Sequence, residues 1–370
     1  MTETYENLMQ LLSAALFNAP CNTKLTEEIR TEAKKQAVLS LVDTQASATL
    51  AQNIRVIHEH LQLHELLTAN GIPYVILKGC ASASYYPVPE RRTLGDVDFL
   101  VYEKDLNRVD ALLRDNGYTL ESKLCDHHWG YDHDGRTLEM HWRINGIPEG
   151  ESGRLTEKYM SDVIEQAGLK KCGSGVCVMP SDFHHGIICI LHIARHMTSS
   201  GMGLRHLCDW AVFVNSINDF PGLLQACFES IGVMEFARQL TALCTRYLGL
   251  PKQPWAGEYS EAFLSDLIED ILSGGNFGRK KSTVYEGVFT NSEGKGRLLT
   301  GIRSMNKIVC NYWPILSKVP VLLPLGWLWF CGRYLIRVIT GKRKMLSAKT
   351  FREADRRSEL YEKFRLFETQ

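Results

Sequence analysis

The chain has 370 residues, of which 45% are hydrophobic and 23% are charged, a composition typical of a globular protein long enough for two domains. Its 42 basic and 42 acidic residues balance, so bulk charge gives no support for binding to nucleic acid. The eleven cysteines are odd in number and irregularly spaced, which argues against a disulfide framework and favours buried free thiols in a reducing compartment.

The chain begins with a segment, residues 1–70, that we predict to be helical. Apolar residues recur there at spacings of three and four, and Asn70-Gly71 followed by Pro73 ends the pattern. Acids occupy the first positions, where a secretory signal would carry Lys or Arg. We therefore expect a cytoplasmic protein.

Residues 71–150 change to short strands and helices and form a second predicted domain. We expect strands at 74–77, 97–101, 118–123, 129–132 and 137–143, helical turns at 80–86 and a helix at 104–116. His133-Asp134-Gly135 is a hairpin signal between the last two strands. The order predicts a small mixed sheet within an α+β fold.

Helical periodicity returns after residue 150 and predicts a helical domain over 151–318. The expected helices are 153–167, 181–199, 204–217, 221–230, 233–248, 258–273, 297–311 and 346–367.

The last segment, 319–370, begins with an apolar run to Cys331 that is shorter than the roughly 20 residues of a spanning helix. Two interpretations of 319–344 stay open: a core helix with a basic end, and a weak contact with a membrane surface that would make the protein peripheral there.

The most informative stretch is 91–101, where Asp96 and Asp98 lie two residues apart in an otherwise apolar run. Side chains two apart on a strand project to the same face. Two neighbouring acids repel each other and are costly to desolvate unless a cation lies between them, and a divalent metal is the usual reason for the arrangement. A metal between two acids is the core of phosphoryl-transfer chemistry.

Glu139 raises the same question on a later strand, because Leu138, Met140 and Trp142 point one way while Glu139 and His141 point the other. If this strand adjoins the Asp strand, Glu139 joins the two aspartates on one sheet face. Three carboxylates can hold two Mg²⁺ ions, or one metal and an activated hydroxyl. The alternative for each acid is a turn or an exposed strand face.

Several segments together resemble an uncharacterised bacterial family of the nucleotidyltransferase superfamily related to DNA polymerase beta. They are Leu77-Lys78-Gly79, Tyr85-Tyr86-Pro87, Arg92, 95–101, Glu139-Met140-His141-Trp142, His192 with His196, 204–210 and 275–279. The likeness covers most of residues 50–340. One departure is that Cys80 follows Gly79, where the superfamily usually has Gly-Gly or Gly-Ser, so Ser82, Ser84 or helix-start amides are expected to replace that phosphate anchor.

This resemblance implies a metal-dependent nucleotidyltransferase that moves an NMP group from an NTP, such as ATP, to an unknown acceptor hydroxyl and releases pyrophosphate. Asp96, Asp98 and Glu139 would hold Mg²⁺, with Mn²⁺ also possible, and Glu139 would draw the proton from the acceptor. The expected nucleotide-binding residues are Lys78, Gly79, Ser82, Arg92, Gly95, Arg205, Asp209 and Arg279. The resemblance also implies that 71–150 is the catalytic core and that 151–318 is a helical domain that binds the substrate or the nucleotide.

Two other classes of protein are consistent with these residues. Glycosyltransferases use Asp-x-Asp to bind a nucleotide-sugar through Mn²⁺, although they usually have a full nucleotide-binding domain before the motif. A catalytically inert nucleotide-binding or partner-binding module is the second alternative. The acceptor, the preferred NTP and the oligomeric state stay open at this point.

Overall fold

The computed structural model describes residues 38–122, 127–198, 201–273, 305–306, 309–310, 312–313, 315–340 and 359–368. They form two compact units. Unit 1 takes the described residues within Met1–Ile193, Arg205–Ser260 and Leu366–Gln370, and unit 2 takes those within Ala194–Leu204 and Glu261–Arg365.

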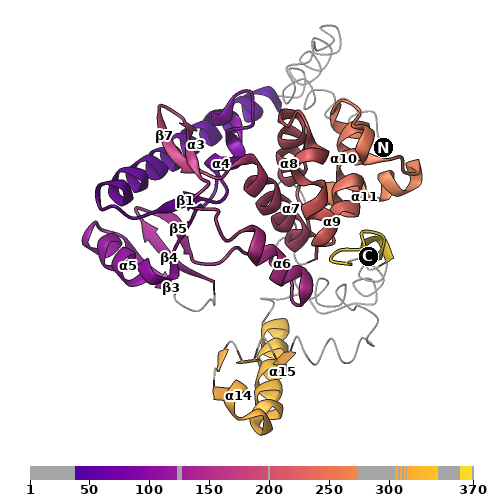
Figure 1. The fold of residues 1–370 in the computed structure, drawn as a ribbon. Coiled ribbons are helices and arrows are strands. Elements are labelled where there is room, and N and C mark those ends of the chain that lie inside the picture. Colours follow the sequence, from indigo (N-terminus) through magenta and orange to yellow (C-terminus); the bar gives the residue numbers. More distant parts are fainter. Residues whose placement is uncertain are drawn as a thin grey trace. The chain divides into compact units, whose positions relative to one another are not determined.

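A five-stranded mixed sheet lies in unit 1 (Figure 1), with the strand order β1-β2-β5-β4-β3. The strands are β1 Tyr74–Ile76, β2 Val97–Val101, β3 Thr119–Ser122, β4 His128–His133 and β5 Arg136–His141. β2 and β5 run parallel, whereas β1 pairs with β2, β3 with β4 and β4 with β5 in antiparallel register. All five predicted strands are confirmed, and the α+β class with them.

Along the chain, the helices of unit 1 precede, separate and follow these strands. They are α3 Val38–Ala69, α4 Cys80–Ala83, α5 Leu106–Asp115, α6 Glu151–Tyr159, α7 Asp182–Thr198, α8 Leu204–Ser216, α9 Ala226–Ser230 and α10 Met234–Leu248, with α7 and α8 extending into unit 2. Short 3-10 turns cover Pro89–Arg91, Glu103–Asp105 and Pro254–Ala256, and a π-helical turn covers Pro221–Gln225. The predicted helices between 38 and 248 are therefore confirmed, although α6 ends before the predicted residue 167. Residues 1–37 of the predicted helical segment 1–70 lie outside the described residues.

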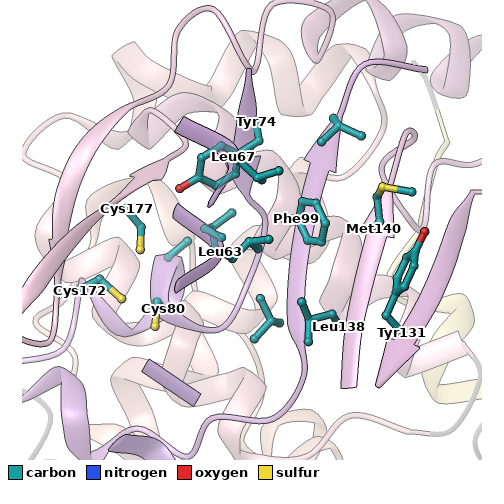
Figure 2. Packing of buried hydrophobic residues seen from close by; sticks show 14 of the residues in the cluster. Leu63, Leu67, Tyr74, Cys80, Phe99, Tyr131, Leu138, Met140, Cys172 and Cys177 are labelled. Atoms are coloured by element: carbon teal, nitrogen blue, oxygen red, sulfur yellow. The ribbon is translucent and has the colours of Figure 1, made fainter. Parts of the chain in front are cut away.

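One face of the sheet forms the hydrophobic core against α3 and α5 (Figure 2). Val97, Phe99 and Val101 of β2 and Leu138 and Met140 of β5 all belong to this buried cluster. Because side chains alternate along a strand, the residues between them, including Asp98 and Glu139, project from the opposite face.

A two-stranded hairpin, β6 Gly168–Cys172 and β7 Gly175–Met179, was not predicted. It lies between the predicted helices 153–167 and 181–199, in a stretch for which no element was predicted. β6 is mostly exposed and carries Lys170 and Lys171, so its sequence lacks the alternation of apolar and polar residues that is typical of a strand. Cys177 and Met179 of β7 are buried in the same core as the sheet. The core of the first 150 residues therefore extends past 150, and the domain limits at 70, 150 and 318 stay predictions.

The nine cysteines in the described part of the chain are all free thiols, and seven of them are buried. This agrees with the expected buried thiols. Figure 2 shows three of them, Cys80, Cys172 and Cys177, at one end of the core.

Unit 2 contains α11 Glu261–Ser273, α14 Ile315–Lys318, a 3-10 turn Pro320–Leu322 and α15 Leu323–Ile339. Two further helices were predicted at 297–311 and 346–367, and most of their residues lie outside the described part of the chain. None of the helices that the structure describes has the length and apolarity needed to cross a membrane. Leu325, Leu328 and Ile336 of α15 are exposed, and the membrane contact of 319–344 stays a prediction.

Candidate active site

The parallel register of β2 and β5 places Asp98 directly opposite Glu139. Their neighbours along each strand fill the core, so both carboxylates project from the other face of the sheet. Asp98 is buried, and the Glu139 side chain is 25% exposed. The expected meeting of these two acids is thus present, on adjacent central strands.

Asp96 lies just before β2 and is exposed. Partial burial and then repulsion by Asp98 and Glu139 raise the pKa of Asp96, against opposing effects of Lys78 and Arg205. The three predicted acids therefore form one interacting cluster. Its excess negative charge is the electrostatic condition that favours a bound cation.

Two cationic groups lie against Asp98. The Lys78 Nζ atom is 2.6 Å from Asp98 Oδ1, and the His141 Nε2 atom is 3.1 Å from the same oxygen. Burial alone would raise the pKa of Asp98, but Lys78 and His141 outweigh it and hold that pKa well below its usual value. Lys78, expected to contact phosphate, neutralises an acid in this state.

His141 and His128 are the residues that the sequence analysis missed. His141 Nε2 also lies 3.2 Å from Glu139 Oε2, and His128 Nε2 lies 3.7 Å from Glu139 Oε1. Burial is the largest single influence on the pKa of His141, and it lowers that pKa. The hydrogen bonds to Asp98 and Glu139 act against burial, and the pKa of His141 is raised overall. The sequence does contain a signal that brings these two histidines together. The two-residue turn at Asp134-Gly135 fixes the register of the hairpin and so sets His128 opposite His141.

Gly79 allows the chain to turn beside the acid cluster. Its φ of 57° and ψ of −109° suit glycine, and a Cβ atom there would lie 3.3 Å from His60 Nε2. Two amides of the following turn, those of Ala81 and Ala83, donate to the carbonyls of Lys78 and Gly79. These amides are therefore already used within the chain, and the helix start does not offer them as the expected phosphate anchor.

Replacing Gly79 with Ala is expected to lower the free energy of unfolding by about 1–3 kcal/mol, because the new side chain holds a strained backbone conformation and presses on His60. Urea unfolding followed by circular dichroism measures this. Gly95→Ala is the control, since its Cβ atom would meet nothing within 4 Å. An equal loss in both variants would contradict the special role of Gly79.

Arg92 and Asp209 form a buried, two-pronged ion pair. Arg92 Nε donates to Asp209 Oδ1 at 2.7 Å and Arg92 Nη2 to Asp209 Oδ2 at 2.6 Å, while the Tyr86 hydroxyl donates to Oδ1 at 2.7 Å. The pair joins the loop before β2 to α8. Its geometry supports a positioning role, and direct contact of either residue with a nucleotide stays a prediction.

The other predicted nucleotide-binding residues lie in different surroundings. Arg205 Nη1 donates to the Thr93 carbonyl at 3.3 Å, and its charge lowers the pKa of Asp96, so it borders the acid cluster. Ser82 is buried in α4, whereas Gly95 is exposed just before Asp96. Arg279 lies outside the described residues.

The arrangement can hold a cation and bind phosphate. Carboxylate oxygens of Asp96, Asp98 and Glu139 supply hard, anionic donors, which is the donor type that Mg²⁺ and Mn²⁺ accept. Lys78 and Arg205 supply positive charge at the border of the cluster. Three acids bordered by bases are typical of sites that position a polyphosphate.

In the comparison with known protein families, residues 8–249 match the model of a family described as uncharacterised nucleotidyltransferases. The resemblance seen in the sequence is thereby confirmed. No curated protein matches the chain. Among solved structures, an antigenic nucleotidyltransferase-like protein from Paracoccidioides brasiliensis is similar at 16% identity with a TM-score of 0.36, covering 65% of this chain and 98% of that one.

Proposed function

Because this chain belongs to the uncharacterised nucleotidyltransferase family, we propose that its acid cluster transfers a nucleotidyl group from an NTP to an acceptor hydroxyl. The observation that carries the proposal is the register of β2 and β5, which sets Asp98 opposite Glu139 beside Asp96. The acceptor oxygen would form a bond to the α-phosphorus, the bond from that phosphorus to the bridging oxygen would break, and pyrophosphate would leave.

The donor set fits a divalent cation. Asp96, Asp98 and Glu139 are the residues that would hold Mg²⁺, or Mn²⁺ in its place. Desolvation and then repulsion by Asp98 and Glu139 raise the pKa of Asp96, and a cation would relieve the repulsion. When bound, the ion would neutralise charge on the triphosphate and lower the pKa of the attacking hydroxyl.

The side chains of this chain supply the remaining steps. Glu139, partly exposed beside Asp98, would accept the proton of the acceptor hydroxyl. When the NTP binds, the Lys78 ammonium group would leave Asp98 and contact a phosphate oxygen instead. Arg205 would contact a second phosphate group. The Arg92–Asp209 pair would keep the preceding loop in place for both. The seven buried free thiols favour a reducing, cytoplasmic location for this reaction.

The direct test incubates the full-length protein with Mg²⁺ and each α-labelled NTP, together with small alcohols, sugars, tRNA or protein as acceptors. Pyrophosphate release that depends on an acceptor, with label in the product, is the expected result. Consumption of a UDP-sugar without pyrophosphate release would contradict the proposal and indicate a glycosyltransferase. Nucleotide binding with no turnover on any acceptor would indicate an inert module.

A further inference from the structure

Two imidazoles join Glu139 on the face of the sheet opposite the hydrophobic core. His128, Glu139 and His141 each offer a ligand atom, and these atoms all lie within 4.8 Å of one another. His128 of β4 is paired with His141 of β5, and Glu139 lies two residues before His141, so the three side chains share one face. The sheet itself therefore sets the spacing of this group.

The distances suit a metal ion. Two ligand atoms that lie about 2.1 Å from a metal are about 3.0 Å apart at a right angle and about 3.4 Å apart in a tetrahedron. His141 Nε2 and Glu139 Oε2 are 3.2 Å apart, and His128 Nε2 is 3.7 Å from Glu139 Oε1. A small inward movement of His128, whose side chain is 18% exposed, would complete the set.

Each of the two imidazoles has one buried ring nitrogen that lacks a hydrogen-bond partner among the described residues. The His141 side chain is fully buried, and among the described residues its Nδ1 atom has no hydrogen-bond partner. The Nδ1 atom of His128 is also buried, and it too has no hydrogen-bond partner among the residues that the structure describes. A buried polar atom without a partner destabilises the fold, so these rings are costly to keep for packing alone.

The donor chemistry selects the ion. Imidazole nitrogen binds first-row transition metals, whereas Mg²⁺ prefers an all-oxygen shell that retains several waters. We infer that His128, Glu139 and His141 form a binding site for a divalent transition metal such as Mn²⁺ or Zn²⁺, adjacent to Asp96 and Asp98. This rests on the proposed function for the role of the ion, but the binding itself does not require turnover.

The test measures Mn²⁺ binding to the full-length, chelator-treated protein by electron paramagnetic resonance, in the presence of excess Mg²⁺. Protein-bound Mn²⁺ with a nitrogen coupling from imidazole is expected in the wild type. His128→Ala should weaken Mn²⁺ binding by about 10–100-fold and remove part of that coupling. His58→Ala, which removes an exposed imidazole from α3, is the matched control and should bind like the wild type.

Bound Mn²⁺ without nitrogen coupling in the wild type would overturn the inference, whether or not the variant folds. Unchanged affinity in a folded His128→Ala protein would also overturn it. These results are distinguishable from failure of the proposed function: NTP turnover with Mg²⁺ and no nitrogen-bound Mn²⁺ removes only the inference, while nitrogen-bound Mn²⁺ without NTP turnover removes only the reaction.

Discussion

Replacement of Asp98 with Asn is expected to lower nucleotidyl transfer by roughly 10²–10³-fold or more, because it removes one charge from the group that stabilises the transferring phosphate. Asn keeps the shape of the side chain, so the loss reports charge rather than packing. Pyrophosphate release at saturating NTP and Mg²⁺ measures the effect. Asp115→Asn, an exposed change on α5, is the matched control and should retain wild-type turnover.

The stability of the Asp98 variant adds a second readout. Lys78 and His141 hold the folded-state pKa of Asp98 below its unfolded value, so the charged carboxylate stabilises the fold at neutral pH. This contribution disappears as the pH falls through the folded pKa, where the protonated acid resembles Asn. The wild type and Asp98→Asn should therefore differ most in unfolding midpoint near neutral pH and converge in acid. Full turnover by a folded Asp98→Asn protein would sink the proposed reaction.

Replacement of Arg92 with Met is expected to lower the free energy of unfolding by about 3–5 kcal/mol, because it leaves Asp209 buried without its partner. The side chains of the pair are 5% and 7% exposed, so water does not replace the lost contact. Urea unfolding measures the change. The double variant Arg92→Met with Asp209→Leu removes both charges and should recover part of the loss.

A surface pair provides the comparison. Arg114 and Asp110 lie four residues apart on α5, with Arg114 49% exposed, so Arg114→Met should leave the unfolding midpoint nearly unchanged. If Arg92→Met is no more harmful than Arg114→Met, the Arg92–Asp209 pair does not hold the loop before β2. If the double variant is as unstable as Arg92→Met, the cost comes from lost packing rather than from an unpaired charge.

Local chemistry made much of the sheet predictable. β2 coincides with the predicted strand 97–101, because its valines and Phe99 have strong β propensity and alternate with residues of the opposite face. The Asp134-Gly135 turn, with φ of 52° and 74°, marks the β4–β5 hairpin. The hairpin β6–β7 escaped prediction because its exposed strand carries lysines and only its partner strand shows alternation.

The sequence by itself determined the elements and the acids, because helix period, strand alternation and turn residues act over a few neighbouring positions. It could not determine which strands become neighbours or which distant charges meet. Asp98 faces Glu139 only because β2 and β5 run side by side, and Arg92 reaches Asp209 across 117 positions. Such pairings are decided by the burial of one shared core, which gathers segments that no local pattern connects.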